Sequence, residues 1–421
     1  MTLDVVGNRQ SGLPRGVHGA ADPHFACVVR NFAGTFRGSR FGGGALAVYL
    51  DGEPVVDVWT GYADRRGQVP WTADSASMVF SATKGMASTV IHRLVDRGLI
   101  AYDVPVAHYW PEFGANGKAD ITVRQMMQHQ AGLSALRGAS KEDLLNHELM
   151  ERRLAAARPG YSFGRSAYHA LTYGWLLSGL ARAVTGKGMG KLIREELAEP
   201  LGTDGLHLGR PPADAPTQCT QIVMPQSTFQ NPVFNAVAPI VAAIPQAAGF
   251  SSMYFPGVKA VAQGDIPLLD AEIPAANGVA TARGLARMYS AIANGGRVDG
   301  TQFLSPEVAA GLNGRRSLRP DGNLVIPLAF HLGYHRLPLD VVPGFGHVGL
   351  GGSVGWADPD HGLAIGFVHN RLLTPFVLFD HAGLVATSAL CRISAAAARK
   401  DGFDRVADFG APFAEAGAAA G

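Results

Sequence analysis

Ser81 and Lys84 are the residues whose types and spacing most directly suggest a reaction. They form the pattern Ser81-Ala82-Thr83-Lys84 at the start of a segment with helical periodicity. Three residues make almost one helical turn, so the hydroxyl and the amine can share one face and form a hydrogen bond. A desolvated lysine that loses its proton can act as a base toward the serine. The N-terminus of the helix would add N–H groups near a developing oxyanion. The pattern alone is common, because most such pairs lie on a solvated helix face.

Two later segments carry residues that could complete such a site. One is the run Tyr168-His169-Ala170, which opens a helical segment, and the other is His347-Val348-Gly349-Leu350, which precedes a strand. In this order, the three segments resemble the motifs of the serine β-lactamase and penicillin-binding-protein superfamily. The resemblance is to its class C branch, and in particular to the carboxylesterases called family VIII, and it covers about residues 42–369.

The resemblance implies a role for each of these residues. Ser81 would be the acylated nucleophile and Lys84 its partner on the helix. Tyr168 would relay protons, with its proton affinity lowered by nearby lysine charge. The N–H groups of Ser81 and Leu350 would hold the oxyanion. No cofactor is needed for this chemistry.

The chain departs from the β-lactamase pattern at two positions that affect the choice of substrate. Ala170 stands where the lactamases have an asparagine, so a side-chain amide that could bind the substrate is missing. His347 stands where they have a lysine, and histidine is mostly neutral near pH 7. We expect His347, Gly349 and Ala170 to line a substrate site that favours a neutral ester over an anionic lactam.

The function predicted from these residues is hydrolysis of short- to medium-chain carboxylic esters through an acyl-enzyme on Ser81. A β-lactamase, a D-aminopeptidase or an acyltransferase of the same superfamily is the alternative. A binding protein that keeps the fold without catalysis is a third possibility. The presence of Ser81, Lys84 and Tyr168 together argues against it, because a scaffold alone has no physical need for them.

Ser353 offers a competing nucleophile in the pattern Gly351-Gly352-Ser353-Val354-Gly355. In an α/β-hydrolase, such a serine occupies a sharp turn between a strand and a helix. The residues that follow here are typical of a strand and a turn, so we assign Ser353 to structure. Other polar residues also have simpler interpretations. Asn277 is predicted in a turn. His129 is predicted at a helix end, and His331 and His335 are predicted in one strand. These histidines do not share a helix face, so no metal site is expected.

The periodicity of the chain predicts the elements that must position these residues. Two β-rich runs, 45–50 and 54–59, flank Asp51-Gly52 and predict a hairpin. Helical spacing covers 81–97, then 123–130, 141–157, 170–184 and 190–198. Thr281 is a predicted N-cap. Strands are expected at 328–334, 352–357 and 363–369, and a last helix at 376–399.

This order of elements predicts an α+β fold, with one antiparallel sheet built from both ends of the chain and flanked by helices. We expect residues 1–110 and 275–408 to form the sheet domain and residues 111–274 an inserted, mostly helical domain. The Pro- and Gly-rich stretch 212–276 is either a merely structural insertion or a wall of the acyl or alcohol pocket. Residues 409–421 are expected to be disordered.

The composition narrows the classes of partner. Lys and Arg number 36 against 34 Asp and Glu in 421 residues, so the net charge of +2 predicts no binding to nucleic acid. The cysteines Cys27, Cys219 and Cys391 are too far apart to suggest a zinc site or a disulfide framework. Neither a signal peptide nor a membrane span is visible, which favours the cytoplasm. The expected partner is a small ester, and the oligomeric state is left open.

Overall fold

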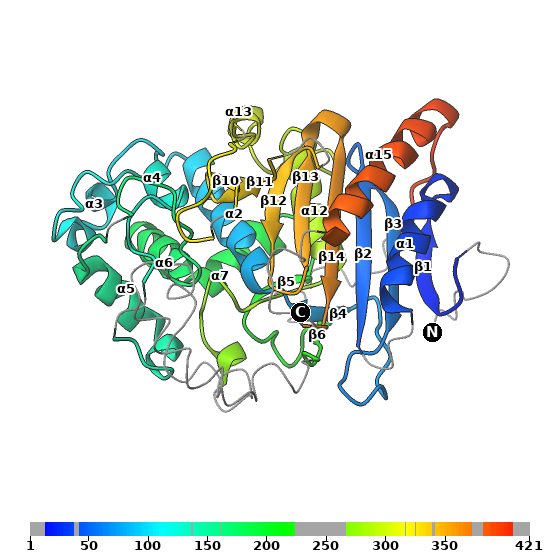
Figure 1. Ribbon diagram of the computed structural model, residues 1–421, viewed down its shortest axis with the longest axis horizontal. Coiled ribbons are helices and arrows are strands. Elements are labelled where there is room, and N and C mark those ends of the chain that lie inside the picture. Colours follow the sequence, from blue (N-terminus) through cyan, green and yellow to red (C-terminus); the bar gives the residue numbers. More distant parts are fainter. Residues whose placement is uncertain are drawn as a thin grey trace, which may run out of the picture.

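A computed structural model describes residues 13–37, 42–135, 138–160, 162–223, 267–315, 317–324, 326–338, 342–372 and 382–406. Within these ranges, eight antiparallel strands form one sheet, which extends from the middle of the molecule to the right side of the view in Figure 1. Their order across the sheet is β1 (Val17–Ala21), β3 (Glu53–Gly61), β2 (Gly43–Leu50), β14 (Leu363–His369), β13 (Val354–Asp358), β12 (Phe345–Val348), β11 (Tyr334–Arg336) and β10 (Ala329–His331). The two ends of the chain meet where β2 pairs with β14, with Val48 opposite Ile365. The predicted α+β fold is therefore confirmed.

The predicted hairpin is present as β2 and β3, with Leu50 opposite Glu53. The two turn residues between them, Asp51 and Gly52, have φ values of 51° and 88°. Positive φ at both positions is typical of the two-residue turn whose twist matches that of the strands, and glycine adopts it without a steric penalty. The Asp-Gly signal thus marked the position of the turn, whereas the register of the two strands shifts further along, between Val48 and Tyr49.

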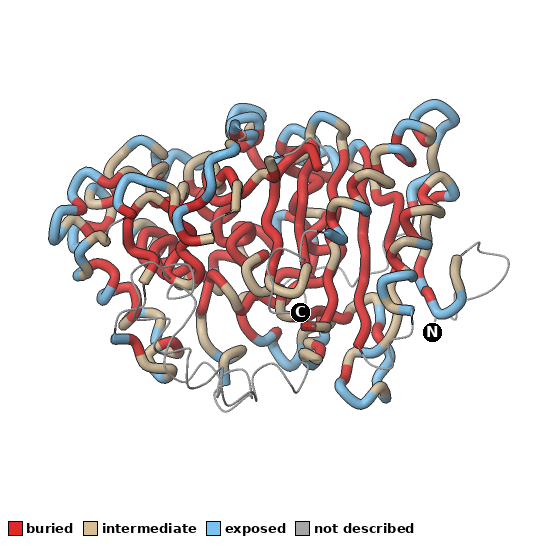
Figure 2. Tube along the Cα trace, viewed as in Figure 1, coloured by how far each residue is buried: buried red, intermediate tan, exposed pale blue. Residues whose placement is uncertain are grey.

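Helices cover both faces of the sheet (Figure 1). Helices α1 (Ala26–Phe36) and α15 (Ala382–Asp401) pack on one face, where Leu46 and Val48 of β2 join their apolar cluster. Helix α12 (Ala282–Ala293) packs on the other face, where Ala47 and Tyr49 join a second cluster. Alternate residues of β2 thus face different layers. All eight residues of this strand are buried as a result (Figure 2).

Helix α2 (Thr83–Asp96) connects the sheet to the helical part of the molecule. It packs against α6 and α7 and also against β11 and β12, and most of its length is buried (Figure 2). The helical part contains α3 (Val106–Tyr109), α4 (Val123–Met127), α5 (His147–Ala156), α6 (Thr172–Thr185) and α7 (Met189–Ile193). No described helix combines the length and the apolar content needed to cross a membrane.

Shorter elements complete the described structure. A small sheet contains β5 (Leu206–Leu208), β7 (Gly278–Ala280), β4 (Ser75–Met78) and β6 (Gln218–Cys219), in that order. Strands β8 (Arg297–Val298) and β9 (Thr301–Gln302) pair with each other, and α13 (Pro306–Gly311) follows them. Because β4 lies in the small sheet and leads into α2, this sheet positions the start of the helix that carries Lys84.

Several predicted elements need correction. The single strand at 328–334 is wrong, because Leu332 and Gly333 have φ values of 46° and 86° and turn the chain between β10 and β11. The helix predicted at 123–130 ends at Met127. The segment 190–198 is α7 followed by a π-helical turn, Arg194–Ala198. Strand β1 and helix α1 were not predicted at all.

Other predictions are confirmed or lie outside the described residues. Thr281 caps α12, since its side chain accepts a hydrogen bond from the N–H of Gly284. The last helix is present as α15, although its predicted start falls among residues 373–381, which are not described. Residues 224–266 of the Pro- and Gly-rich stretch and the tail 409–421 are also outside the described ranges. The two domain boundaries remain predictions.

Candidate active site

Ser81 lies in a tight turn between β4 and α2. The residue before it, Phe80, has a φ of +46°, a conformation that is costly for a bulky side chain and persists where the surroundings enforce it. Thr83 supplies part of that enforcement, because its hydroxyl donates to the carbonyl of Phe80 at 2.5 Å and accepts from the N–H of Gly278 at 2.9 Å. Ser81 is half-buried. The turn therefore presents the serine at a fixed position just before α2.

The amine of Lys84 lies beside the hydroxyl of Ser81, as the S-x-x-K spacing predicted. Its Nζ is 3.0 Å from Oγ of Ser81 and donates to the carbonyl of Ala275 at 2.9 Å. The side chain is fully buried, and this burial lowers the pKa of Lys84 well below the usual lysine value. A lysine in this environment can be neutral and accept a proton from the serine. The contribution of Ala275 was not predicted, because a backbone carbonyl leaves no signal in residue type.

Tyr168 completes the trio from a segment 87 residues further along the chain. Its hydroxyl donates to Oγ of Ser81 at 2.8 Å, and its ring centroid lies 4.9 Å from Nζ of Lys84. The expected lowering of its proton affinity is not found. Burial raises the pKa of Tyr168, and the hydrogen bond that its hydroxyl donates to Ser81 offsets this only in part. Burial also lowers the pKa of Lys84 and so disfavours the positive charge that the expectation assumed. The raised pKa favours the neutral phenol, whose proton is directed at Oγ of Ser81.

The end of β12 approaches the Ser81 turn from the sheet. A Cβ built on Gly349 would lie 2.1 Å from the carbonyl oxygen of Val79, so the two backbones are in direct contact. Leu350 follows Gly349 in the turn toward β13. Among the described residues, no acceptor is found for the N–H of Ser81 or for that of Leu350. Both predicted oxyanion donors thus remain available in the described structure.

His347 lies in β12 and is 2% exposed. Its ring centroid is 6.2 Å from that of Tyr168 and 4.9 Å from that of His335. Ala170, the third residue expected to line the substrate site, is also buried, two residues before α6 begins. The structure therefore places His347 next to Tyr168, inside a cluster of aromatic rings.

The sequence comparisons agree with this geometry. A family model described as Beta-lactamase matches residues 28–389 of the chain. The chain belongs to the β-lactamase family. It is 67% identical over 409 residues to the "Esterase/beta-lactamase LipL" of Mycobacterium tuberculosis, a match that covers 97% of this chain and 95% of that protein. The predicted superfamily is thus confirmed, and it is one of esterase- and β-lactamase-like serine hydrolases.

Solved structures of this family share the fold. A family VIII carboxylesterase is similar with a TM-score of 0.76 and 31% identity, over 89% of this chain and 99% of that one. A penicillin-binding protein homologue from Caulobacter crescentus is similar with a TM-score of 0.73 and 32% identity, over 90% of this chain and 99% of that one. Both likenesses extend over the sheet and the helical part together.

In this β-lactamase-family chain, the side chains of Ser353 and Asn277 make hydrogen bonds that support the local structure. Oγ of Ser353 accepts a hydrogen bond from the N–H of His369 at 3.3 Å, and the residue precedes a strand, as predicted, and not a helix. Asn277 holds a turn, with its amide donating to the carbonyls of Leu268 and Ala271. No three His, Cys, Asp or Glu side chains of the described residues are grouped so that they could hold a metal ion.

The histidines that follow α4 and Tyr168 also serve the structure. His129 lies just beyond α4 and accepts the N–H of His169 on Nδ1 at 3.0 Å. Nε2 of His169 accepts the N–H of Leu133 at 2.9 Å, so its Nδ1 carries the proton and donates to the carbonyl of Ala167 at 2.7 Å. Burial lowers the pKa of His169 to about 4. The neutral imidazole rings of His129 and His169 therefore fix the backbone around Tyr168 through these hydrogen bonds.

His331 and His335, expected in one strand, instead lie on the adjacent strands β10 and β11.

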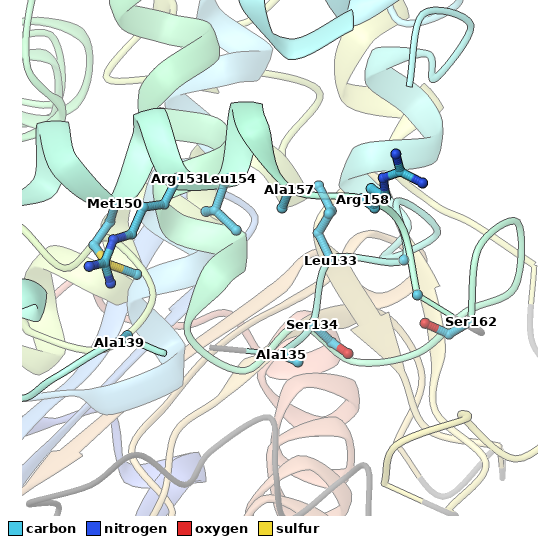
Figure 3. A pocket seen from close by; sticks show the side chains of 12 residues that line it. Leu133, Ser134, Ala135, Ala139, Met150, Arg153, Leu154, Ala157, Arg158 and Ser162 are labelled. Carbon is cyan, nitrogen blue, oxygen red and sulfur yellow. The ribbon is translucent and has the colours of Figure 1, made fainter. Parts of the chain in front are cut away.

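A cavity of about 290 Å³ lies near this segment (Figure 3). Its walls include Leu133, Met150 and Leu154, and its polar lining includes Ser134, Ser162, Arg153 and Arg158. Leu133 connects the cavity to the segment that contains Tyr168, because its N–H donates to Nε2 of His169. The cavity is large enough for a small organic group.

Proposed function

We propose that this chain is a serine carboxylesterase that hydrolyses short- to medium-chain esters through an acyl-enzyme on Ser81. The observation that carries the proposal is the position of the Ser81 hydroxyl, 3.0 Å from the buried amine of Lys84 and 2.8 Å from the phenol of Tyr168. A serine is a weak nucleophile until an adjacent base takes its proton. The two groups around Ser81 can supply one proton acceptor and one proton donor.

Acylation uses both groups in turn. Neutral Lys84 takes the proton of the Ser81 hydroxyl as Oγ bonds to the ester carbonyl carbon, and the carbonyl oxygen becomes an oxyanion. The N–H groups of Ser81 and Leu350 donate to that oxyanion. Tyr168 gives its proton to the departing alkoxide when the carbon–oxygen bond breaks. The proton on Lys84 then neutralises the phenolate, and the alcohol leaves.

Deacylation repeats these steps with water. A water molecule in the place of the alcohol gives a proton to the Lys84 and Tyr168 pair and adds to the acyl carbon. The same two N–H groups stabilise the second oxyanion. When the bond to Oγ breaks, the serine regains its proton and the carboxylic acid is released. No metal or organic cofactor takes part in this scheme.

The choice of a neutral ester rests on the residues around the trio. His347 replaces the lysine of the lactamases, and Ala170 replaces their asparagine, so both groups that would bind an anionic amide substrate are absent. The likeness to a family VIII carboxylesterase supports the same substrate class. A β-lactamase is the second candidate, because the relative at 67% identity is named for both activities.

A fluorophosphonate and two chromogenic substrates test the proposal. We expect the intact mass to increase by one label per chain, with the modified peptide containing Ser81, and S81A to lose both labelling and esterase activity. The kcat/KM for p-nitrophenyl butyrate should exceed that for nitrocefin. Modification at Ser353, or cleavage of activated esters by S81A at the wild-type rate, would overturn the assignment. Comparable turnover of nitrocefin would favour the β-lactamase.

A further inference from the structure

The backbone of Tyr168 lies outside regular secondary structure. It belongs to an irregular segment between a turn at 162–165 and the start of α6. Its N–H and C=O therefore have no partner in a strand or a helix. Buried backbone groups are almost always paired, so other parts of the chain must satisfy them.

Two side chains from a distant segment supply these partners. The N–H of Tyr168 donates to Oδ1 of Asp321 at 2.9 Å, and its carbonyl accepts from Nδ2 of Asn323 at 2.8 Å. Asp321 is 2% exposed and Asn323 is 5% exposed. One short loop thus binds both main-chain polar groups of Tyr168. Its two residues, Asp321 and Asn323, follow Tyr168 by 153 and 155 positions in the sequence.

The Asp321 carboxylate is itself firmly held. Its Oδ1 also accepts the N–H groups of Asn323 at 2.9 Å and Leu324 at 3.1 Å, and its Oδ2 accepts the hydroxyl of Ser166 at 3.0 Å. The N–H of Gly322 donates to the carbonyl of Ser166 at 2.9 Å. The loop and the Tyr168 segment therefore form one hydrogen-bonded unit.

The ring of Tyr168 is restrained by Phe330, which lies seven residues after Asn323 in the sequence. Phe330 stacks on it with a centroid distance of 5.3 Å and an interplanar angle of 17°. With the backbone held by Asp321 and Asn323 and the ring held by Phe330, the phenol reaches Oγ of Ser81 at 2.8 Å. Misplacing a reacting group by about 1 Å can cost about 10²-fold in rate.

We propose that Asp321 and Asn323 are positioning residues that set the reach of the Tyr168 hydroxyl toward Ser81. The inference rests on the proposed function, in which Tyr168 gives a proton to the leaving alcohol. Neither residue touches the reacting atoms. Both act by fixing the backbone from which the phenol extends.

Substitution of Asp321 gives the first test. Asp321→Ala should lower kcat for p-nitrophenyl butyrate by about 10-fold or more, with KM changed less than about threefold. Asp321→Asn should restore kcat to within about fivefold of the wild type, because the amide oxygen can accept the bonds made by Oδ1 while the amide nitrogen donates to Ser166. Asp22→Ala is the matched control. Asp22 is also 2% exposed and accepts two backbone N–H groups, from His24 and Asp404, and its loss should lower Tm without changing kcat.

A double-mutant cycle with Tyr168→Phe separates positioning from a general structural effect. If Asp321 acts through the phenol, Asp321→Ala should change kcat less than about twofold in the Tyr168→Phe background. An equal loss of kcat in both backgrounds, or no loss in the wild-type background, would overturn the inference. Wild-type kcat in Tyr168→Phe alone would instead refute the proposed proton donor. Should Asp321→Ala fail to fold, Asn323→Ala enters the same cycle, because it removes the donor to the Tyr168 carbonyl and leaves the carboxylate in place.

Discussion

Gly349 packs directly against the backbone carbonyl of Val79, and no side chain fits between them. A Cβ at this glycine would lie 2.1 Å from the carbonyl oxygen and 3.1 Å from the carbonyl carbon. The contact joins the end of β12 to the turn that carries Ser81. It therefore fixes the distance between the two segments whose N–H groups are proposed to hold the oxyanion.

Gly349→Ala should separate these two segments. Because the clash is with backbone, the strand end or the turn must move, and we expect unfolding to become easier by about 1–3 kcal/mol. We expect kcat for p-nitrophenyl butyrate to fall at least about 10-fold, since an oxyanion donor would be displaced. Urea unfolding and steady-state kinetics measure the two effects. Gly34→Ala is the control, because a Cβ there meets nothing within 4 Å in helix α1, so it should be neutral or stabilising. Unchanged kcat in Gly349→Ala would contradict the proposed donor.

The buried amine of Lys84 predicts how stability depends on pH. Its pKa is lowered in the folded state, so the unfolded chain binds more protons between that value and the usual lysine value. The free energy of unfolding should therefore rise with pH through this window, and the contribution should be lost as the pH falls through the lowered pKa. Lys84→Met removes this group, so its free energy of unfolding should rise less steeply with pH. Parallel curves for the wild type and Lys84→Met would argue against a lowered pKa.

Activity should depend on the same proton. In the proposed mechanism only neutral Lys84 can accept the serine proton, so kcat/KM should fall on the acid side as the amine becomes protonated. Lys84→Met should lose about 10³-fold or more in kcat. Lys118→Met is the matched control, because Lys118 is also buried, with its amine bound to the carbonyls of Ala115 and Ala157, and its loss should leave kcat unchanged. A kcat/KM that stays level toward low pH would count against the lysine base.

Ser353 provides a direct comparison with Ser81. Ser353→Ala removes the acceptor for the N–H of His369, and we expect a loss of about 1 kcal/mol in stability. Labelling by a fluorophosphonate and turnover of p-nitrophenyl butyrate should stay within about twofold of the wild type. Mass spectrometry of the labelled variant checks this. A variant that no longer takes up the label would return Ser353 to consideration as the nucleophile.

Local patterns in the sequence were sufficient where the interaction is local. The Asp51-Gly52 turn was predicted because glycine tolerates positive φ, and the Thr281 cap was predicted because its hydroxyl bonds within its own helix. The contact between Ser81 and Lys84 spans three residues of chain, so helical spacing alone indicated it. The strand pair β10 and β11 was missed, because a leucine at positive φ in the turn gives no local warning.

The order of motifs along the chain also predicted that Tyr168 would join Ser81, although only through resemblance to a known family. The direction of its pKa shift was wrong, because burial of the phenol is the largest cause of the shift and raises the pKa. The Ala275 carbonyl and the Asp321 carboxylate were missed for a related reason. Each accepts a hydrogen bond from a residue far away in the sequence, Lys84 or Tyr168, and local sequence does not indicate such a contact.

The sequence by itself therefore indicated the family, the candidate nucleophile Ser81 with its helical partner Lys84, and the two substitutions on which the proposed preference for an ester rests. The tertiary structure alone decided how strongly each group is desolvated, which carbonyl holds the lysine and which loop holds the tyrosine. The physical reason is that residue type and spacing specify contacts within one element, whereas burial and long-range hydrogen bonds arise only when elements from both ends of the chain pack together.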